Sequence, residues 1–158
     1  MFTFLKSRRK LREARTKIGV DLHRQVRIAF MTDDKVASER LATSFTVGYI
    51  YSFIRNGFYS LGVDADSSIE TQVRRVCDGI LPGKLYNIFS SQREALNFAR
   101  GMKDQDSEIL NTGRTPSDVA VMFVHGCNAG VYDAPLVSTQ IAPPDNLRRF
   151  LLNENLRS

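Results

Sequence analysis

Two apolar stretches, TSFTVGYIYSFIRNGFYSL over Thr43–Leu61 and TPSDVAVMFVHGCN over Thr115–Asn128, decide the predicted fold. In the middle of the first stretch, apolar residues would lie on nearly every side of a helix, and the second stretch is unbroken in its apolar character from Val119 to Val124. A helix that is apolar all round is a buried helix. The sequence therefore predicts two central helices, at about 43–55 and 116–128, packed inside amphipathic ones.

Local signals favour helices over strands in both stretches. Thr115–Asp118 combines an N-cap threonine, a proline at the first helical position and an acidic residue in the first turn. Thr46–Phe53 is rich in residues that favour sheets, but a helical pattern leads into it without an intervening turn. Asn56-Gly57 and Gly130 are expected to end the two helices, because these residues tolerate positive φ angles.

Amphipathic helices are expected around this pair. Apolar spacing and capping residues place them from about Phe4 to Phe30, from the capping box Ser67–Glu70 to Ile80, from a second capping box Ser91–Glu94 to Met102, and from Asp145 to Leu152. The helix that contains the first apolar stretch is expected to begin earlier, and to run from about Asp34 to Ile54. The three prolines within residues 131–144 predict an extended segment.

The sum is an all-α chain: a single-domain bundle of six or seven helices with two buried apolar central helices. Residues 1–30 are expected to form a basic N-terminal helix whose first half projects from the body or frays. Residues 31–130 would form the helical core. Residues 131–158 would supply the extended segment and a short C-terminal helix.

Composition is that of one globular domain. The chain has 158 residues, of which 42% are hydrophobic and 25% charged. Two cysteines, Cys77 and Cys127, cannot form a disulfide framework, so we expect a cytoplasmic protein. No transmembrane span is expected either, because the most apolar stretch contains Arg55 and Asn56.

The positive charge is concentrated at one end of the chain. Residues 1–30 hold nine basic and two acidic residues, a net charge of +7, whereas residues 31–158 have a net charge of −2. Such a segment attracts phosphates, anionic lipids or acidic protein surfaces, although a solvated helix face would look the same. The candidate anion-binding residues are Lys6, Arg8, Arg9, Lys10, Arg12, Arg15 and Lys17.

A cluster of aromatic residues in the first apolar stretch suggests a second kind of site. Phenylalanine and tyrosine side chains could line a pocket for a small apolar ligand and fix its polar end. Ordinary core packing would give the same pattern. The candidate ligand-binding residues are Phe45, Tyr49, Tyr51, Phe53, Arg55 and His125.

Catalytic and metal-binding motifs are weak in this sequence. Val121–Gly126 resembles the strand and His-Gly loop that help to form the oxyanion hole of α/β-hydrolases, which implies a catalytic loop at His125. However, the chain has no G-x-S-x-G nucleophile elbow, and Thr115–Asp118 predicts a helix at this position. His125 and Cys127 are two residues apart and would diverge on a helix. We therefore predict no catalytic residue, no metal site and no cofactor.

The expected function is binding rather than catalysis. A protein partner or self-association is the leading expectation, through an exposed helix face or residues 131–144. Self-association is included because the basic N-terminal helix has an apolar stripe that would need a partner: Leu11, Ala14, Ile18, Leu22, Gln25/Val26 and Ala29. The alternatives are a small apolar ligand in a pocket lined by Phe45–Tyr59, and attachment of residues 6–27 to nucleic acid or an anionic membrane surface.

Overall fold

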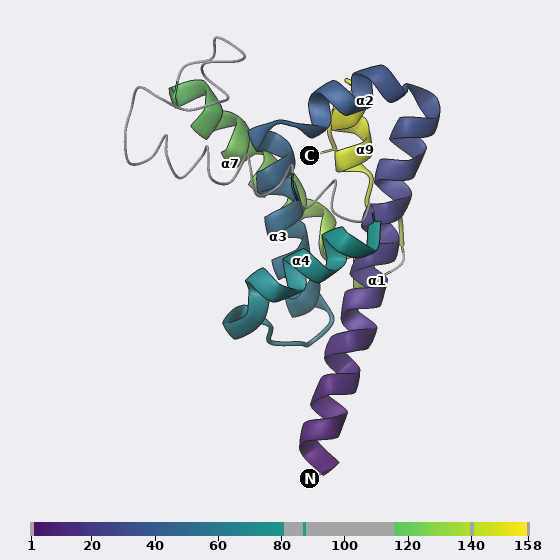
Figure 1. Ribbon diagram of the computed structural model, residues 1–158, viewed down its shortest axis with the longest axis vertical. Coiled ribbons are helices and arrows are strands. Elements are labelled where there is room, and N and C mark those ends of the chain that lie inside the picture. Colours follow the sequence, from purple (N-terminus) through teal and green to yellow (C-terminus); the bar gives the residue numbers. More distant parts are fainter. Residues whose placement is uncertain (1, 81–86, 88–115, 140, 158) are drawn as a thin grey trace.

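The computed structural model of the chain is an all-α bundle (Figure 1), which confirms the predicted fold class. It describes residues 2–80, 87, 116–139 and 141–157, and for residues 2–6 and 116–120 the backbone alone. No strand occurs in this part of the chain. The helices are α1 (Phe2–Thr32), α2 (Asp34–Leu41), α3 (Ser44–Ser60), the 3-10 turn η1 (Asp66–Ser68), α4 (Ile69–Ile80), α7 (Pro116–Asp133), α8 (Leu136–Thr139) and α9 (Asn146–Leu151).

The single helix predicted over residues 34–54 is wrong, because two helices, α2 and α3, occupy this range. The helix is interrupted between them, where threonine hydroxyls bond to a backbone carbonyl. The hydroxyls of Thr43 and Thr46 both donate to the carbonyl of Arg40, at 2.9 and 3.1 Å. Local hydrogen bonds of this kind compete with the helical ladder.

The two central helices, α3 and α7, pack against each other at very close range. A Cβ atom at any of three glycines would overlap main-chain atoms of the other helix: Gly48 those of Phe123, Gly126 those of Phe45, and Gly130 those of Tyr49. Small residues allow two helix axes to come close together, so that the two backbones make weak contacts with each other. α3 is buried on nearly every side, as predicted. The predicted burial of the second helix is wrong, because α7 covers α3 from the outside and exposes Val121 and Val124 by about half.

The predicted ends of both central helices are wrong. α3 continues through Gly57, which lets α1 approach: a Cβ atom there would lie 3.1 Å from Cγ1 of Ile18. It ends instead before Gly62, whose φ of +68° is the left-handed conformation that glycine favours. α7 likewise continues through Gly130 to Asp133, because this glycine serves packing rather than chain reversal.

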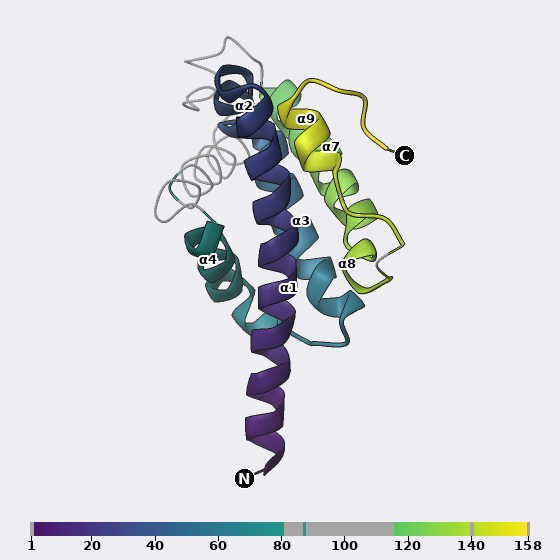
Figure 2. The ribbon, with the colours of Figure 1, turned by 90° about the vertical axis from the view of Figure 1, so that its right-hand side faces the viewer.

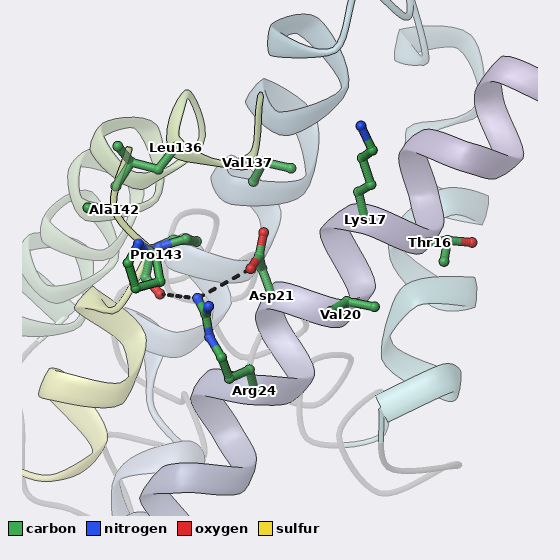
Figure 3. Close-up of a pocket in the computed structure, with 10 residues that line it drawn as sticks. Thr16, Lys17, Val20, Asp21, Arg24, Leu136, Val137, Ala142 and Pro143 are labelled. Carbon is green, nitrogen blue, oxygen red and sulfur yellow. Dashed lines mark hydrogen bonds and ion pairs between the residues drawn. The ribbon is translucent and has the colours of Figure 1, made fainter. Parts of the chain in front are cut away.

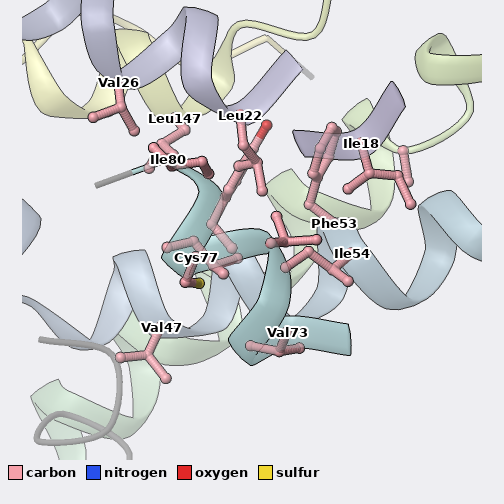
Figure 4. Close-up of a cluster of buried hydrophobic side chains, with 14 of the residues drawn as sticks. Ile18, Leu22, Val26, Val47, Phe53, Ile54, Val73, Cys77, Ile80 and Leu147 are labelled. Carbon is pink, nitrogen blue, oxygen red and sulfur yellow. The ribbon is translucent and has the colours of Figure 1, made fainter. Parts of the chain in front are cut away.

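The predicted apolar stripe of α1 is buried within the chain itself. Ile18 and Leu22 are fully buried, and they meet side chains such as Phe53 and Leu147 from α3 and α9 (Figure 4). α1 runs along the bundle beside α4, and its N-terminal end extends beyond the other helices (Figures 1 and 2). This end continues the same helix that packs in the bundle from Ala14 onwards.

Two other expectations have different outcomes. The predicted helix that starts at Ser91–Glu94 lies outside the described residues. The extended segment predicted at 131–144 is wrong over most of its length, because residues 131–133 complete α7 and residues 136–139 form α8. Among the described helices, none has a long enough apolar run to cross a membrane.

Candidate functional site: the cationic face of α1

One edge of α1 faces α4 and carries three arginines. Steps of three and four residues keep positions on the same side of a helix. On α1, such steps place Arg8, Arg12, Arg15, Gly19 and His23 along this edge. Arg15, Gly19 and His23 line a groove between α1 and α4.

The facing edge of α4 follows from its own amphipathic pattern. The buried side of this helix carries Val73, Val76 and Ile80. Gln72 is buried at the border of that side, and Arg75 and Gly79 follow it by steps of three and four residues. The sequence of α4 therefore brings a second arginine, Arg75, to the groove that Arg15 lines.

The α1–α4 groove has a volume of about 360 Å³. Its buried apolar residues are Val76 and Ile80, and Val20 is exposed beside them. Arg15 and Arg75 are the first residues of α1 and α4 that line it. Both glycines of the groove, Gly19 and Gly79, have open space where a Cβ atom would be. The groove is thus kept open by residues that lack side chains.

Arg15 is held in place by an uncharged partner. Its Nη1 atom donates to Oε1 of Gln72 at 3.3 Å, and Nε2 of Gln72 donates to Oγ of Ser68, also at 3.3 Å. Partial burial, together with the nearby charges of Arg75 and Arg12, lowers the pKa of Arg15. Within the part of the chain that the structure describes, no carboxylate forms an ion pair with Arg12, Arg15 or Arg75.

The projecting part of α1 exposes further cations. Arg8, Arg9, Lys10, Arg12 and Lys17 are all exposed. A salt bridge of 2.8 Å joins Arg9 to Glu13, and both side chains are largely in solvent, so this pair neutralises little of the field. The side chain of Lys6 lies outside the described residues. The predicted anion-binding residues that can be placed therefore lie on one helix, and Arg75 of α4 was missed.

A second groove lies on the other side of α1 and is lined by two cations, Lys17 and Arg24, of which Arg24 is neutralised. It has a volume of about 430 Å³, and it is bounded by α1 and residues 136–144 (Figure 3). Arg24 points into it and is bound on two sides, by Oδ1 of Asp21 at 3.2 Å and by the carbonyl of Pro144 at 3.1 Å. This arginine stabilises the fold and has little capacity left for an anion.

The residues predicted to line an apolar ligand pocket are not gathered around one cavity. Phe45, Tyr49 and Phe53 are buried and stack on one another, and Phe45 also stacks on Phe150 at 3.8 Å between ring centroids. Tyr51 is partly buried against the core. None of these residues lines either groove of α1.

The other two residues of that predicted pocket, Arg55 and His125, lie at the surface. Arg55 is exposed and pairs with Asp66 at 3.0 Å, and Asp66 also accepts a hydrogen bond from Tyr59. His125 is exposed on α7. Its position on a helix removes the structural basis of the hydrolase-like loop.

A buried polar network, which the sequence did not reveal, lies between α1, α3, α7 and α9. Asp133 accepts hydrogen bonds from the Tyr49 hydroxyl at 2.7 Å and from the Asn146 backbone and side-chain nitrogens at 2.8 and 3.0 Å. Gln25 bonds to Tyr49 at 3.0 Å and accepts from the backbone nitrogen of Leu147 at 3.0 Å. The network thereby caps the N-terminus of α9 with side chains from other helices.

Burial controls the protonation of this network. Burial, with the neighbouring Asp133 carboxylate, raises the pKa of Tyr49 well above its ordinary value. Burial also raises the pKa of Asp133, and the hydrogen bonds from Tyr49 and Asn146 oppose that shift. Because every member is within the core, the network fixes helix positions and is closed to ligands.

The cysteines and histidines do not form a reactive or metal-binding group. Cys77 is buried, and burial raises the pKa of its thiol to about 12. Cys127 is partly buried on α7. Among the described residues, no three or more histidine, cysteine or acidic side chains are placed so as to hold a metal ion.

The cationic face of α1, with Arg75 of α4, is thus the surface with a chemistry of its own. Comparison with known proteins finds no family, no curated protein and no solved structure that matches this chain.

Proposed function

We propose that this chain is a non-enzymatic binding protein that attaches to double-stranded nucleic acid through the cationic face of α1. The observation that carries the proposal is the exposure of Arg8, Arg9, Lys10, Arg12 and Lys17 on a helix that extends beyond the bundle (Figure 2). Attraction to phosphates supplies most of the affinity of sequence-independent nucleic-acid binding. The proposal places the protein in the cytoplasm.

The composition of this face supports nucleic acid over a lipid bilayer. Over residues 7–17 the exposed side chains are all polar: Ser7, Arg8, Arg9, Lys10, Arg12, Glu13, Thr16 and Lys17. Leu11 and Ala14 pack towards the bundle. A helix that lies in a membrane interface needs an apolar face to bury, and this part of α1 has none left. Arginine, the commoner cation here, binds phosphate oxygens in a bidentate manner.

Backbone contacts, rather than base stacking, are the expected mode of binding. Proteins that bind single strands stack bases on exposed aromatic side chains between cations. Here Phe45, Tyr49 and Phe53 are in the core, and over residues 7–29 α1 exposes no phenylalanine, tyrosine or tryptophan side chain. A duplex offers closely spaced phosphates without any need for stacking.

Self-association loses one of its reasons in this fold. The sequence suggested that the apolar stripe of α1 needs a partner molecule. Ile18, Leu22 and Ala29 are instead fully buried within the chain.

A protein partner remains a second proposal because of α7. Its outer side exposes Val121, Val124, Val131 and Tyr132, each by about half. Scattered apolar residues are normal, but four on one helix side are a candidate contact. We expect Val124→Glu with Val131→Glu to abolish any concentration-dependent dimer measured by sedimentation. A wild-type chain that is monomeric at all concentrations would contradict a dimer through this side.

The main proposal is tested with a fluorescent duplex of about two helical turns. We expect the logarithm of the binding constant to fall linearly with the logarithm of salt concentration, with a slope that reports the phosphates contacted. The double variant Arg9→Gln/Lys10→Gln should reduce this slope. Arg27→Gln/Lys35→Gln is the matched control, since it removes the same charge from exposed residues outside the projecting N-terminal end of α1.

Two results would overturn the proposal. One is the absence of duplex binding at low salt. The other is tighter binding to phosphatidylserine vesicles than to the duplex, which would assign the cationic face to membranes.

A further inference from the structure

The α1–α4 groove concentrates positive charge in a way that folding alone does not explain. Arg15 and Arg75 come from two helices and line the same groove, and Arg12 lies about one turn before Arg15 on α1. Like charges at short range destabilise a fold. Other arginines of this protein are compensated: Arg24 by Asp21, and Arg148 and Arg149 by Asp145.

The central arginine of this group is oriented before any ligand arrives. Gln72 is buried and holds Nη1 of Arg15 through its Oε1 atom, while Ser68 holds the amide of Gln72. A glutamine fixes the guanidinium without neutralising it, whereas a glutamate would have paired with it. Preorganised arginines of this kind bind phosphate oxygens with less loss of side-chain freedom.

We propose that Arg12, Arg15 and Arg75 form a phosphate-binding site at the end of the α1–α4 groove, and that it holds one backbone phosphate of the nucleic acid. The identity of the ligand rests on the proposed function, whereas the site rests on the three arginines alone. The site extends the contact surface from α1 to α4, so the nucleic acid crosses both helices instead of following α1 only. Gln72 is a positioning residue in this site.

Arg75→Gln and Arg74→Gln provide a matched test on one helix. The two residues are adjacent and exposed, and both variants remove one positive charge, but Arg74 lies near Asp78, at 3.9 Å, and outside the groove. We expect Arg75→Gln to weaken duplex binding about tenfold and to reduce the salt slope by about one. Arg74→Gln should weaken binding by less than about threefold. Equal effects of the two variants would overturn the site.

Gln72→Glu tests the site from beneath without removing an arginine. The new carboxylate would pair with Arg15 and compete with a phosphate. We expect a loss of duplex affinity at least as large as that of Arg75→Gln. Helical circular dichroism should match that of the wild type, and Gln72→Met keeps the volume without the charge as a folding control. Unchanged affinity in a folded Gln72→Glu protein would contradict the site.

A second ligand separates this site from the proposed function. Titration with tripolyphosphate, followed by calorimetry, measures phosphate binding without nucleic acid. Binding that Arg75→Gln abolishes, in a protein that does not bind the duplex, would support the site and reject the proposed function. Duplex binding that is insensitive to Arg75→Gln, with no binding of tripolyphosphate, would reject the site and leave the proposed function in place.

Discussion

At the scale of single residues, Asp133 joins three parts of the protein through hydrogen bonds of its side chain. Its carboxylate is fully buried and receives hydrogen bonds from Tyr49 on α3 and from Asn146 at the start of α9. Asn146 in turn accepts a hydrogen bond from the backbone nitrogen of Arg157 at 2.6 Å. One side chain thus connects the C-terminal end of α7 with a central helix and the C-terminal segment.

Removing this carboxylate should be strongly destabilising. Asp133→Ala leaves the backbone nitrogen of Asn146 buried without an acceptor, and it removes one of two acceptors from the Tyr49 hydroxyl and from the Asn146 side chain. A buried unsatisfied group costs about 1–3 kcal/mol and a lost hydrogen bond about 1 kcal/mol. We expect the free energy of unfolding in urea to fall by about 3 kcal/mol or more. Glu39→Ala, at an exposed position on α2, is the control and should change it by less than about 0.5 kcal/mol. A loss for Asp133→Ala as small as that of the control would show that the network contributes little.

The same residue should make stability depend on pH in a defined direction. The pKa of Asp133 is raised in the folded protein, so the folded state binds its proton more tightly than the unfolded chain does. The stability from this group is present below the ordinary aspartate pKa of about 3.9 and is lost as the pH rises through the folded pKa. We therefore expect the unfolding free energy of the wild type to decline relative to that of Asp133→Asn as the pH rises above about 4. An increase in that interval would contradict a raised pKa.

Cys77 should be unreactive in the folded protein. Cys77 is fully buried and its pKa is raised to about 12, so almost no thiolate forms near neutral pH. We expect iodoacetamide to leave Cys77 unmodified in the native protein and to alkylate it fully in urea, as measured by peptide mass spectrometry. Rapid alkylation of Cys77 in the native state would show that α4 opens readily from the bundle.

At the scale of helices, glycines explain why the central pair packs so tightly. Gly126 and Gly130 are four residues apart on α7, and Gly48 lies opposite them on α3. Each of the three places main-chain atoms of the two helices in direct contact. Glycine weakens a helix by about 1 kcal/mol relative to alanine. These positions retain it because a methyl group would push the helices apart.

A pair of glycine substitutions separates propensity from packing. A Cβ atom at Gly126 would overlap the carbonyl of Phe45, whereas one at Gly19 would have nothing within 4 Å. We expect Gly126→Ala to lower the free energy of unfolding by about 2–3 kcal/mol, and Gly19→Ala to raise it by up to about 1 kcal/mol. Urea unfolding measures both. Stabilisation by Gly126→Ala would mean that α3 and α7 are further apart than described.

The same glycines show where prediction from sequence succeeds and where it stops. Apolar periodicity identified the stripe containing Ile18 and Leu22, and the proline at position 116 marked the start of α7, because both signals are local. Gly57 and Gly130 were mistaken for helix ends because a glycine looks the same whether it permits a turn or a close contact. Only the partner helix decides between these roles.

The candidate site divides in the same way. The cationic residues of α1 could be found from charge alone, since exposure follows from their position opposite the apolar stripe. Arg75 was missed because it shares a groove with Arg15 only through the way α4 lies against α1. The residues that make this contact, Arg15 and Gln72, are 57 residues apart in sequence. The network around Asp133 was missed for the same reason: its members lie on four elements.

At the scale of the whole molecule, charge and core are separated along α1. Ala14, Ile18 and Leu22 belong to the core, whereas residues 7–10 are exposed on the part of the helix that extends beyond the bundle (Figure 1). Stability and electrostatic attachment should therefore respond to different truncations. This separation lets the two properties be measured independently.

Deletion of residues 2–10 should remove attachment without weakening the fold. It removes Lys6, Arg8, Arg9 and Lys10, and with them much of the salt-dependent duplex affinity, but it leaves in place Ala14, the first buried residue among the side chains that the structure describes. We expect the free energy of unfolding in urea to change by less than about 0.5 kcal/mol.

Deletion of residues 2–17 is the contrasting variant, because the boundary then cuts into the core. It removes Ala14, which is 4% exposed, and the hydrogen bond from Arg15 to Gln72, leaving the buried amide of Gln72 without that partner. We expect a loss of about 2–3 kcal/mol, from the cavity and from the unsatisfied polar group together. If the shorter deletion destabilised the protein as much as the longer one, the projecting end of α1 would have to pack against the protein. The attachment of a polyanion to this end would then be contradicted.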